Sequence, residues 1–161
     1  MFIVKLSFRT KFADFHDDLD ETRRQQVKDN FETWWKDYIF RKPNITKDEE
    51  ISETQFVDVL NADYKKDKAA FKKKMDKCFN VFFDVIDTNK DRSISEDEFL
   101  IAFKAYGHEN VALDTKFFKA YNPDKDGLVP LHQIVTSWID FTTNDDPKEK
   151  SVVKEAFEAG V

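Results

Sequence analysis

In the segment DTNKDRSISEDE, residues 87–98, oxygen-bearing residues fill every second place from the first to the ninth, and another fills the twelfth. Alternate side chains of a tightly wound loop can turn toward one point, where carboxylate, amide and carbonyl oxygens suit a hard cation such as calcium. We therefore predict a calcium site. Ser93 would contribute its backbone carbonyl, Ser95 would act through a water molecule, and Glu98 would bind with both carboxylate oxygens. The six residues fill the first, third, fifth, seventh, ninth and twelfth places of the loop: Asp87, Asn89, Asp91, Ser93, Ser95 and Glu98.

Arg92 occupies the sixth place of this loop, where such loops normally carry glycine. The sixth place needs a positive φ, which glycine reaches without steric penalty, whereas a residue with a side chain is strained there by about 1 kcal/mol. We expect the Arg92 side chain to make no ligand and to point to solvent. Its charge opposes the ion weakly through water. The expected consequence is a lower affinity or a stiffer loop, not the loss of the site.

A second loop, residues 122–133, has the glycine that the first loop lacks but has fewer charged ligands. Gly127 fills its sixth place, and carboxylates fill its third and fifth places. Its first and twelfth places hold neutral amides, and Pro130 in the ninth place offers no side-chain oxygen. Because calcium affinity follows ligand charge, we predict that this loop binds calcium weakly or not at all. Its candidate ligands are Asn122, Asp124, Asp126, Leu128 and Gln133.

A third segment, NITKDEEISETQ at residues 44–55, has only the outline of such a loop. Ile51 and Gln55 would be its eighth and twelfth residues, but Thr46 and Glu49 stand in the third and sixth places. We expect this segment to pair with another helix–loop unit and not to bind calcium.

Helices are needed on both sides of each loop to position the ligands. Apolar residues at helical spacing predict a helix over residues 68–86, directly before the first loop. A second predicted helix carries Phe99, Phe103 and Tyr106 and is closed by Gly107 as a C-cap.

The second loop is flanked in the same way. Asp114 is the predicted N-cap of the helix that leads into it, and the helix that follows carries Trp138. A last short helix is expected to end near Ala159. Ile94 and Val129, the eighth residues of the two loops, are predicted to pair with each other.

The first seventy residues have a less regular pattern. Phe2 to Phe15 is predicted to be a helix, Asp20 is predicted to cap the next helix, and residues 52–61 are predicted to form another. We expect two domains: an N-terminal half at residues 1–67 and a C-terminal loop pair at residues 68–161.

Composition limits the class of protein. The 161 residues include 17 Phe but only 3 Gly, which favours an all-α fold with an aromatic core. A net charge of −6 argues against nucleic acid as a partner. The single cysteine, Cys78, allows no intrachain disulfide and is expected to be a buried apolar filler, which suits a cytoplasmic protein. No signal peptide and no membrane span are predicted.

The runs FFDVIDTNKDRSISEDEF and FFKAYNPDKDGL, followed by W-x-x-F and N-D-D-P, resemble the invertebrate sarcoplasmic calcium-binding proteins, an EF-hand family. The resemblance covers residues 30–161. It implies an all-α fold of EF-hand helix–loop–helix units in two packed pairs, and a cytosolic buffer of calcium, and often magnesium, in muscle and nerve. Magnesium could then occupy the loop at residues 87–98. Here the first hand is expected to be truncated, because Phe2 to Phe15 resembles only its exiting helix, and the second hand, WWKDYI with its loop, to be degenerate.

Three functions follow from these observations, and the preferred one is a monomeric calcium buffer, for which the sequence implies no particular protein partner. One alternative is a luciferin-type small-molecule binder on the same scaffold. Two observations argue against this alternative: no histidine stands beside Trp138 in its helix, and aromatic residues at helical spacing more often belong to the core. A second alternative is a calcium sensor that grips a target helix, but such sensors are rich in Met and this chain has 2. An enzyme is not expected, because the histidines His16, His108 and His132 are scattered and no catalytic motif is present.

Overall fold

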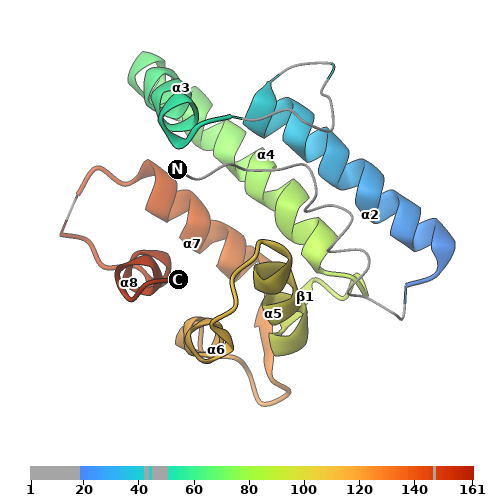
Figure 1. The fold of residues 1–161 in the computed structure, drawn as a ribbon. Helices are drawn as coiled ribbons and strands as arrows, with labels where there is room; N and C mark the ends of the chain where they lie inside the picture. The colour runs from blue at the N-terminus through green and yellow to red at the C-terminus, as the bar shows by residue number, and fades with distance from the viewer. Residues whose placement is uncertain (1–18, 42–43, 45–50, 147) are drawn as a thin grey trace. The chain divides into compact units, whose positions relative to one another are not determined.

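The computed structural model describes residues 19–41, 44, 51–146 and 148–161. Over these residues the chain forms seven α-helices, one short π-helix and two short strands, which confirms the helical class (Figure 1). The chain divides into two compact units, residues 1–74 and 75–161, and helix α4 contributes to both. The domain division expected from the sequence, at residue 67, stays a prediction. The predicted helix from Phe2 to Phe15 and half of the segment 44–55, residues 45–50, lie outside the described residues.

Helix α2, Glu21–Trp34, begins at the predicted cap. The Asp20 carboxylate accepts a hydrogen bond from the Arg23 N–H at 2.7 Å, as an N-cap does. The chain then continues as the π-helix η1, Trp35–Phe40, and ends at Arg41 with a left-handed φ of 54°. The sequence pattern predicted one continuous helix here and did not reveal the change of winding.

Helix α3, Glu53–Lys66, is longer than the predicted segment 52–61. It starts with a capping box, in which Ser52 and Gln55 each satisfy the other's backbone N–H. Asp67 alone separates α3 from α4: its backbone ends the first helix, and its carboxylate accepts from the Ala70 N–H at 3.0 Å to begin the second.

Helix α4, Lys68–Ile86, has the bounds that the apolar spacing predicted. Its buried residues include Cys78, in keeping with the predicted role of an apolar filler. After the first loop, α5 runs over Glu96–Ala105 and ends at Tyr106. Gly107 follows with a φ of 89°, so the chain turns there through the left-handed conformation that glycine reaches most easily.

Helix α6, Val111–Ala120, corrects one prediction. Its N-cap is Asn110, whose side chain accepts from the Leu113 N–H at 3.2 Å, and not Asp114. Asp114 instead lies in the first turn and is buried, with its Oδ1 2.6 Å from Nδ1 of His108. Because Asn110, four positions earlier, caps the helix, Asp114 is not needed as the cap and lies instead against His108.

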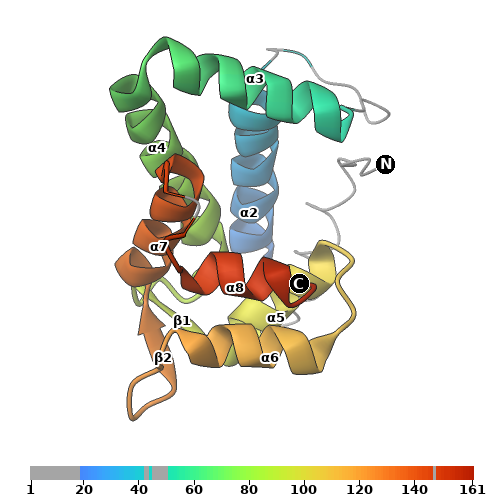
Figure 2. The same ribbon diagram turned by 90° about the vertical axis from the view of Figure 1, so that its left-hand side faces the viewer.

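The second loop leads through a short strand into α7, Leu131–Thr143, and the chain ends with α8, Val152–Glu158. Strand β1, Ser93–Ser95, pairs in antiparallel register with strand β2, Leu128–Pro130 (Figure 2). Ile94 lies opposite Val129, which confirms the predicted pairing.

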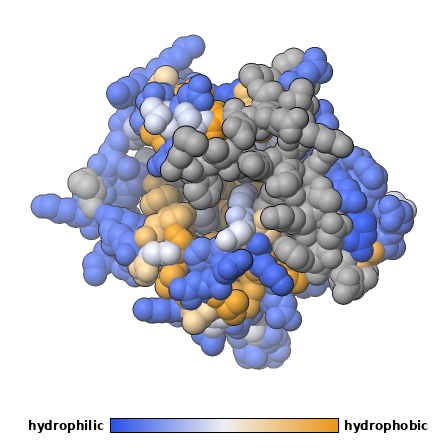
Figure 3. Space-filling model, viewed as in Figure 1, coloured by the Kyte–Doolittle hydropathy of each residue, from blue (hydrophilic) through white to orange (hydrophobic). Residues whose placement is uncertain are grey.

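Aromatic rings fill the second unit. The Phe99 ring stacks on Phe103 at 4.6 Å and meets Phe117 edge-on at 5.3 Å. Trp138 of α7 is the centre of a second cluster, and its ring contacts among the described residues are Phe79, Phe83, Phe117, Phe141 and Phe157. The described surface seen in Figure 3 is mostly hydrophilic, as expected when the apolar residues are taken up by such clusters.

Candidate functional site

The loop at residues 87–98 lies between two helices, with its two ends buried. Asp87 follows the last residue of α4 and is 0% exposed, and Glu98 lies in the first turn of α5 and is 7% exposed. A buried carboxylate needs a compensating charge or hydrogen bonds, because burial disfavours its ionised form. The first and twelfth places of the predicted site are therefore the least solvated, and the helices hold both of them.

Hydrogen bonds between side chains and backbone wind the loop between these ends. The Asn89 side-chain oxygen accepts from the Asp91 N–H at 3.0 Å, and Asp91 Oδ1 accepts from the Ser93 N–H at 2.8 Å. Asp87 Oδ2 accepts from the Arg92 N–H at 3.0 Å. The first, third and fifth places thus each use one oxygen to order the backbone ahead of them.

The carboxylates of this loop repel one another. Burial raises the pKa of Asp87, and the negative charges of Glu98 and Asp91 raise it further, while the hydrogen bond from the Arg92 backbone lowers it. A bound cation would relieve both the desolvation and the repulsion. The electrostatics of the loop therefore favour an ion with more than one positive charge.

Glu98 has both carboxylate oxygens engaged within the loop. Oε1 accepts from the N–H and the hydroxyl of Thr88, each at 2.9 Å. Oε2 accepts from the N–H and the hydroxyl of Ser95, at 3.0 and 2.9 Å, and Ser95 caps α5 in return. The role of Ser95 and Glu98 as a capping box is readable in the sequence as S-x-x-E. The contact with Thr88 spans ten residues and was missed.

Carboxylates alone do not make a cage here. Within the described ranges, no three His, Cys, Asp or Glu side chains are gathered so as to hold a metal ion. A calcium loop of this type draws on amide and backbone carbonyl oxygens as well as carboxylates. The donor set of the loop at residues 87–98 fits such an ion once Asn89, Ser93 and Ser95 are counted with the three acids.

Arg92 has the left-handed conformation that its place requires, with a φ of 66°, and Lys90 shares it with a φ of 62°. The expectation that Arg92 simply points to solvent was incomplete. Its side chain is 60% exposed, yet its Nη1 lies 3.0 Å from Oδ1 of Asp84 in α4. Asp84 stands three residues before the loop, outside the ligand pattern, so the ligand spacing gave no reason to select it.

The loop at residues 122–133 is held together by its own hydrogen bonds. Asp124 Oδ1 accepts from the backbone N–H groups of Asp126 and Leu128, at 2.9 and 3.0 Å. The side-chain amide of Gln133 donates to the backbone carbonyl of Tyr121 at 2.8 Å. Asn122, in the first place, is exposed and has a φ of 55°. The candidate ligands at both ends of this loop are neutral, and the twelfth residue is committed to the backbone.

The two loops are joined through β1 and β2. Ile94 and Val129 are both 0% exposed, and the Leu131 N–H donates to the backbone carbonyl of Arg92 at 2.9 Å. The sixth place of the first loop is therefore bonded to the start of α7. This short ladder connects the backbones of the two loops directly.

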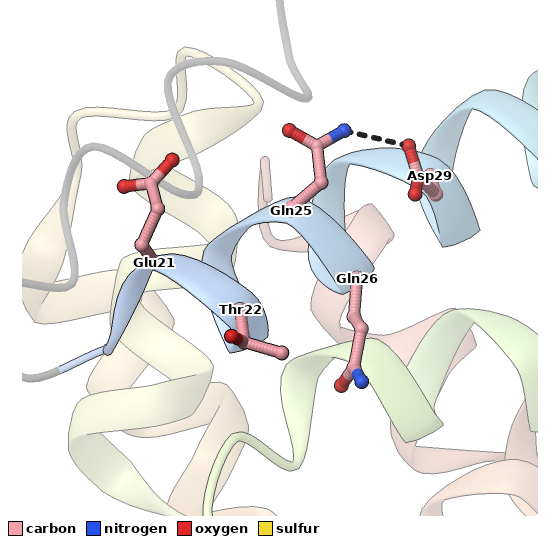
Figure 4. A pocket seen from close by; sticks show the side chains of 5 residues that line it. All are labelled: Glu21, Thr22, Gln25, Gln26 and Asp29. Carbon is pink, nitrogen blue, oxygen red and sulfur yellow. Dashed lines mark hydrogen bonds between the residues drawn. The ribbon is translucent and has the colours of Figure 1, made fainter.

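An open hollow on α2 is the other concave feature of note (Figure 4). The described residues that line it all come from this helix and are exposed, and the link drawn between them is a 2.8 Å hydrogen bond from Gln25 to Asp29. Among the described residues no second element supplies a group to the hollow, so we assign no ligand to it. Its lining residues are Glu21, Thr22, Gln25, Gln26 and Asp29.

Across the part of the chain that the structure describes, no helix combines the length and the apolar character needed to cross a membrane.

Known proteins similar to this chain were found by sequence and by structure, although no protein-family model matches it. The chain is 47% identical over 151 residues to the sarcoplasmic calcium-binding protein of Mizuhopecten yessoensis, covering 94% of this chain and 82% of that protein. In structure it is similar to the coelenterazine-binding protein from Renilla muelleri in its calcium-loaded apo form. The TM-score is 0.72 at 19% identity, over 96% of this chain and 83% of that one. It is also similar to magnesium-loaded apo-berovin, a ctenophore photoprotein, with a TM-score of 0.58 at 14% identity, over 85% of this chain and 74% of that one. At these identities the structural matches establish a shared fold.

Proposed function

The chain belongs to the sarcoplasmic calcium-binding protein family, and on this premise we propose that its loop at residues 87–98 is an EF-hand site that binds calcium. The proposed ligands are those of the sequence pattern: Asp87, Asn89, Asp91, Ser93, Ser95 and Glu98. The observation that carries the proposal is the fully buried carboxylate of Asp87, at the start of a loop whose side-chain oxygens at alternate places order its backbone.

Calcium suits this set better than a transition metal. Every proposed donor is an oxygen, and three of the six residues are acids, whereas softer metals prefer nitrogen and sulfur. The three negative charges on Asp87, Asp91 and Glu98 exceed the charge of one divalent ion, which supports tight binding. Bound calcium would remove the repulsion that raises the pKa of Asp87.

Glu98 is the residue that must rearrange on binding. Its oxygens accept hydrogen bonds from Thr88 and Ser95, so coordination has to share or replace those bonds. Because Glu98 lies in the first turn of α5, a change at this carboxylate acts directly on the helix that leaves the loop. Through its two hydrogen bonds to Oε1, Thr88 holds this twelfth ligand close to the site.

Magnesium is a second ion for the same loop. Related EF-hand loops bind it, as those of berovin do. Magnesium requires a closer, octahedral set of oxygens and retains water more strongly, so it would use fewer of the protein ligands. We expect magnesium to compete with calcium at residues 87–98 with lower affinity.

We propose that the loop at residues 122–133 serves as the structural partner of this site. Its two acids, Asp124 and Asp126, are exposed, and Gln133 is bonded to the Tyr121 backbone. The loop therefore binds calcium weakly or not at all.

The segment at residues 44–55 has the same proposed role in its own pair, and its Ser52–Gln55 capping box corresponds to the Ser95–Glu98 box of the first loop.

The family is not enzymatic, and we propose that this member acts as a cytoplasmic calcium buffer. Buffering fits an interior in which Phe rings contact Trp138, in a chain that has only 2 Met. Calcium-dependent retention on a hydrophobic resin would favour a sensor, and its absence would favour the buffer.

The proposed site is tested by thermal unfolding of the metal-stripped protein with and without calcium. A ligand that binds the native state raises Tm in proportion to the logarithm of its excess over Kd. Asp87→Asn should abolish the calcium-dependent rise, while the matched change Asp124→Asn in the second loop should leave it. A rise that survives Asp87→Asn but not Asp124→Asn would assign calcium to the other loop.

A further inference from the structure

Asp84 lies in the last turn of α4, three residues before the proposed calcium loop, and is not one of its ligands. Its carboxylate contacts two basic side chains of that loop. Oδ1 lies 3.0 Å from Nη1 of Arg92, and Oδ2 lies 2.6 Å from Nζ of Lys90. Lys90 also donates to the Asp84 backbone carbonyl. One helical carboxylate therefore ties down the fourth and sixth places of the loop.

These two places are also where the loop backbone is strained. Lys90 and Arg92 are the residues of this loop with positive φ, a conformation that is unfavourable for residues with side chains. The backbone N–H of Arg92 donates to Oδ2 of Asp87, the first proposed ligand. Ion pairs that keep Lys90 and Arg92 in place therefore also keep the Asp87 carboxylate in place.

The negative charge of Asp84 also favours binding of a cation by the loop. Lys90 and Arg92 bring two positive charges to a loop that would bind a divalent cation, and both repel the ion. Asp84 lies in contact with both and offsets about one of these charges. Its side chain and that of Lys90 are about two-fifths exposed, so water and salt moderate the effect.

We propose that Asp84 is a positioning residue for calcium binding. It holds Lys90 and Arg92 in the conformation that the loop needs and neutralises part of their charge. The proposal rests on the proposed function of the loop at residues 87–98. It accounts for an arginine in a place that normally requires glycine, because the arginine has a partner on the preceding helix.

The test is calcium titration calorimetry of the metal-stripped full chain at low and high salt. The variants are Asp84→Asn, Arg92→Gly and the combination of both. We expect Asp84→Asn to raise Kd about three- to tenfold at low salt, as the loss of two partly exposed ion pairs would, and less at high salt. In the Arg92→Gly background the same change should raise Kd by about twofold or less, because one pair and one strained residue are already gone.

Asp76→Asn is the matched control. It removes the same charge from an exposed position of α4, eight residues earlier and about 12 Å along the helix axis. Its Kd should stay within about twofold of the unmodified chain, as is usual for a screened surface charge. An Asp84→Asn effect equal in both backgrounds, or no larger than that of Asp76→Asn, would overturn the proposal, because Asp84 would then act only as a distant charge.

Amide hydrogen exchange of the metal-free chain supplies a readout that does not depend on calcium. The Arg92 amide, which is bonded to Asp87, should exchange faster in Asp84→Asn than in Asp76→Asn. Equal exchange rates in these two variants would also overturn the proposal. If the unmodified chain bound no calcium, the proposed function would fail, but the exchange comparison would still decide whether Asp84 holds the loop.

Discussion

Ile94 of β1 and Val129 of β2 lie directly opposite each other in antiparallel register, and both side chains are fully buried. One comes from the loop proposed to bind calcium and the other from the loop proposed to bind weakly or not at all. The pair is thus the packed contact through which the second loop supports the first.

Val129→Ala should therefore weaken calcium binding at residues 87–98, although Val129 is in the other loop. The truncation leaves a cavity beside Ile94, so the free energy of unfolding should also fall, by about 1 to 3 kcal/mol. Titration calorimetry and urea unfolding check the two effects. Val111→Ala removes the same atoms from a residue that is 59% exposed and should change neither quantity. Equal calcium Kd values for both variants would show that the loops act independently.

The local features of this chain were the ones that its sequence predicted well. The Ile94–Val129 pair and the bounds of α4 depend on spacing within one short segment, and both are confirmed. The predicted N-cap of α6 was wrong, because Asp114 is a good capping residue in isolation and only the fold shows that it is buried against His108. The contacts of Asp84 were missed for the same reason: they join an acid of α4 to two basic side chains of the loop and follow no repeat.

Restoring acids to the second loop should create a second calcium site. In Asn122→Asp combined with Gln133→Glu, the number of carboxylates among the proposed ligands rises from two to four, and the twelfth residue can bind with two oxygens. Calorimetry should then give a stoichiometry one higher than that of the unmodified chain. Gln133→Glu alone should give a smaller gain, because the first place stays neutral. No second event in the combined variant would indicate that the loop backbone itself excludes the ion.

Asp63 gives the first unit a pH-dependent contribution to stability. A hydrogen bond from Lys74 lowers the pKa of Asp63 below its usual 3.8, although partial burial opposes this, and Arg41 lowers it further. Both basic groups lie 2.9 Å from Oδ2. Because the folded-state pKa is the lower one, the stabilisation is complete at pH values well above 3.8 and is lost as pH falls through the folded-state value.

Asp63→Asn should accordingly lower the free energy of unfolding near pH 6, by about 1 kcal/mol or less because these side chains are partly exposed. The difference from the unmodified chain should shrink as pH falls below 3.8 and vanish below the folded-state pKa. Urea unfolding of the calcium-free protein across this range measures it, with Asp58→Asn as a control at an exposed position of the same helix. A difference that did not depend on pH would rule out the ionised carboxylate as the cause.

His108→Ala should destabilise the second unit. Asp114 is 2% exposed, and its Oδ1 lies 2.6 Å from the histidine ring, so the variant leaves a buried carboxylate oxygen without this contact. We expect a loss of about 1 to 3 kcal/mol in the free energy of unfolding. His132→Ala, at an exposed position in α7, is the matched control and should be close to neutral. If the two variants were equally stable, the contact between His108 and Asp114 would contribute nothing to the packing of α5 against α6.

The most direct test of the calcium site is the stoichiometry of calcium binding to the metal-stripped chain, measured by titration calorimetry with Glu98→Gln alongside. We predict one tight event per chain. We also predict that Glu98→Gln eliminates this event, because the twelfth ligand then loses its charge and its ability to bind with two oxygens. No tight event in the unmodified chain, or one that Glu98→Gln leaves intact, would contradict the assignment of calcium to residues 87–98.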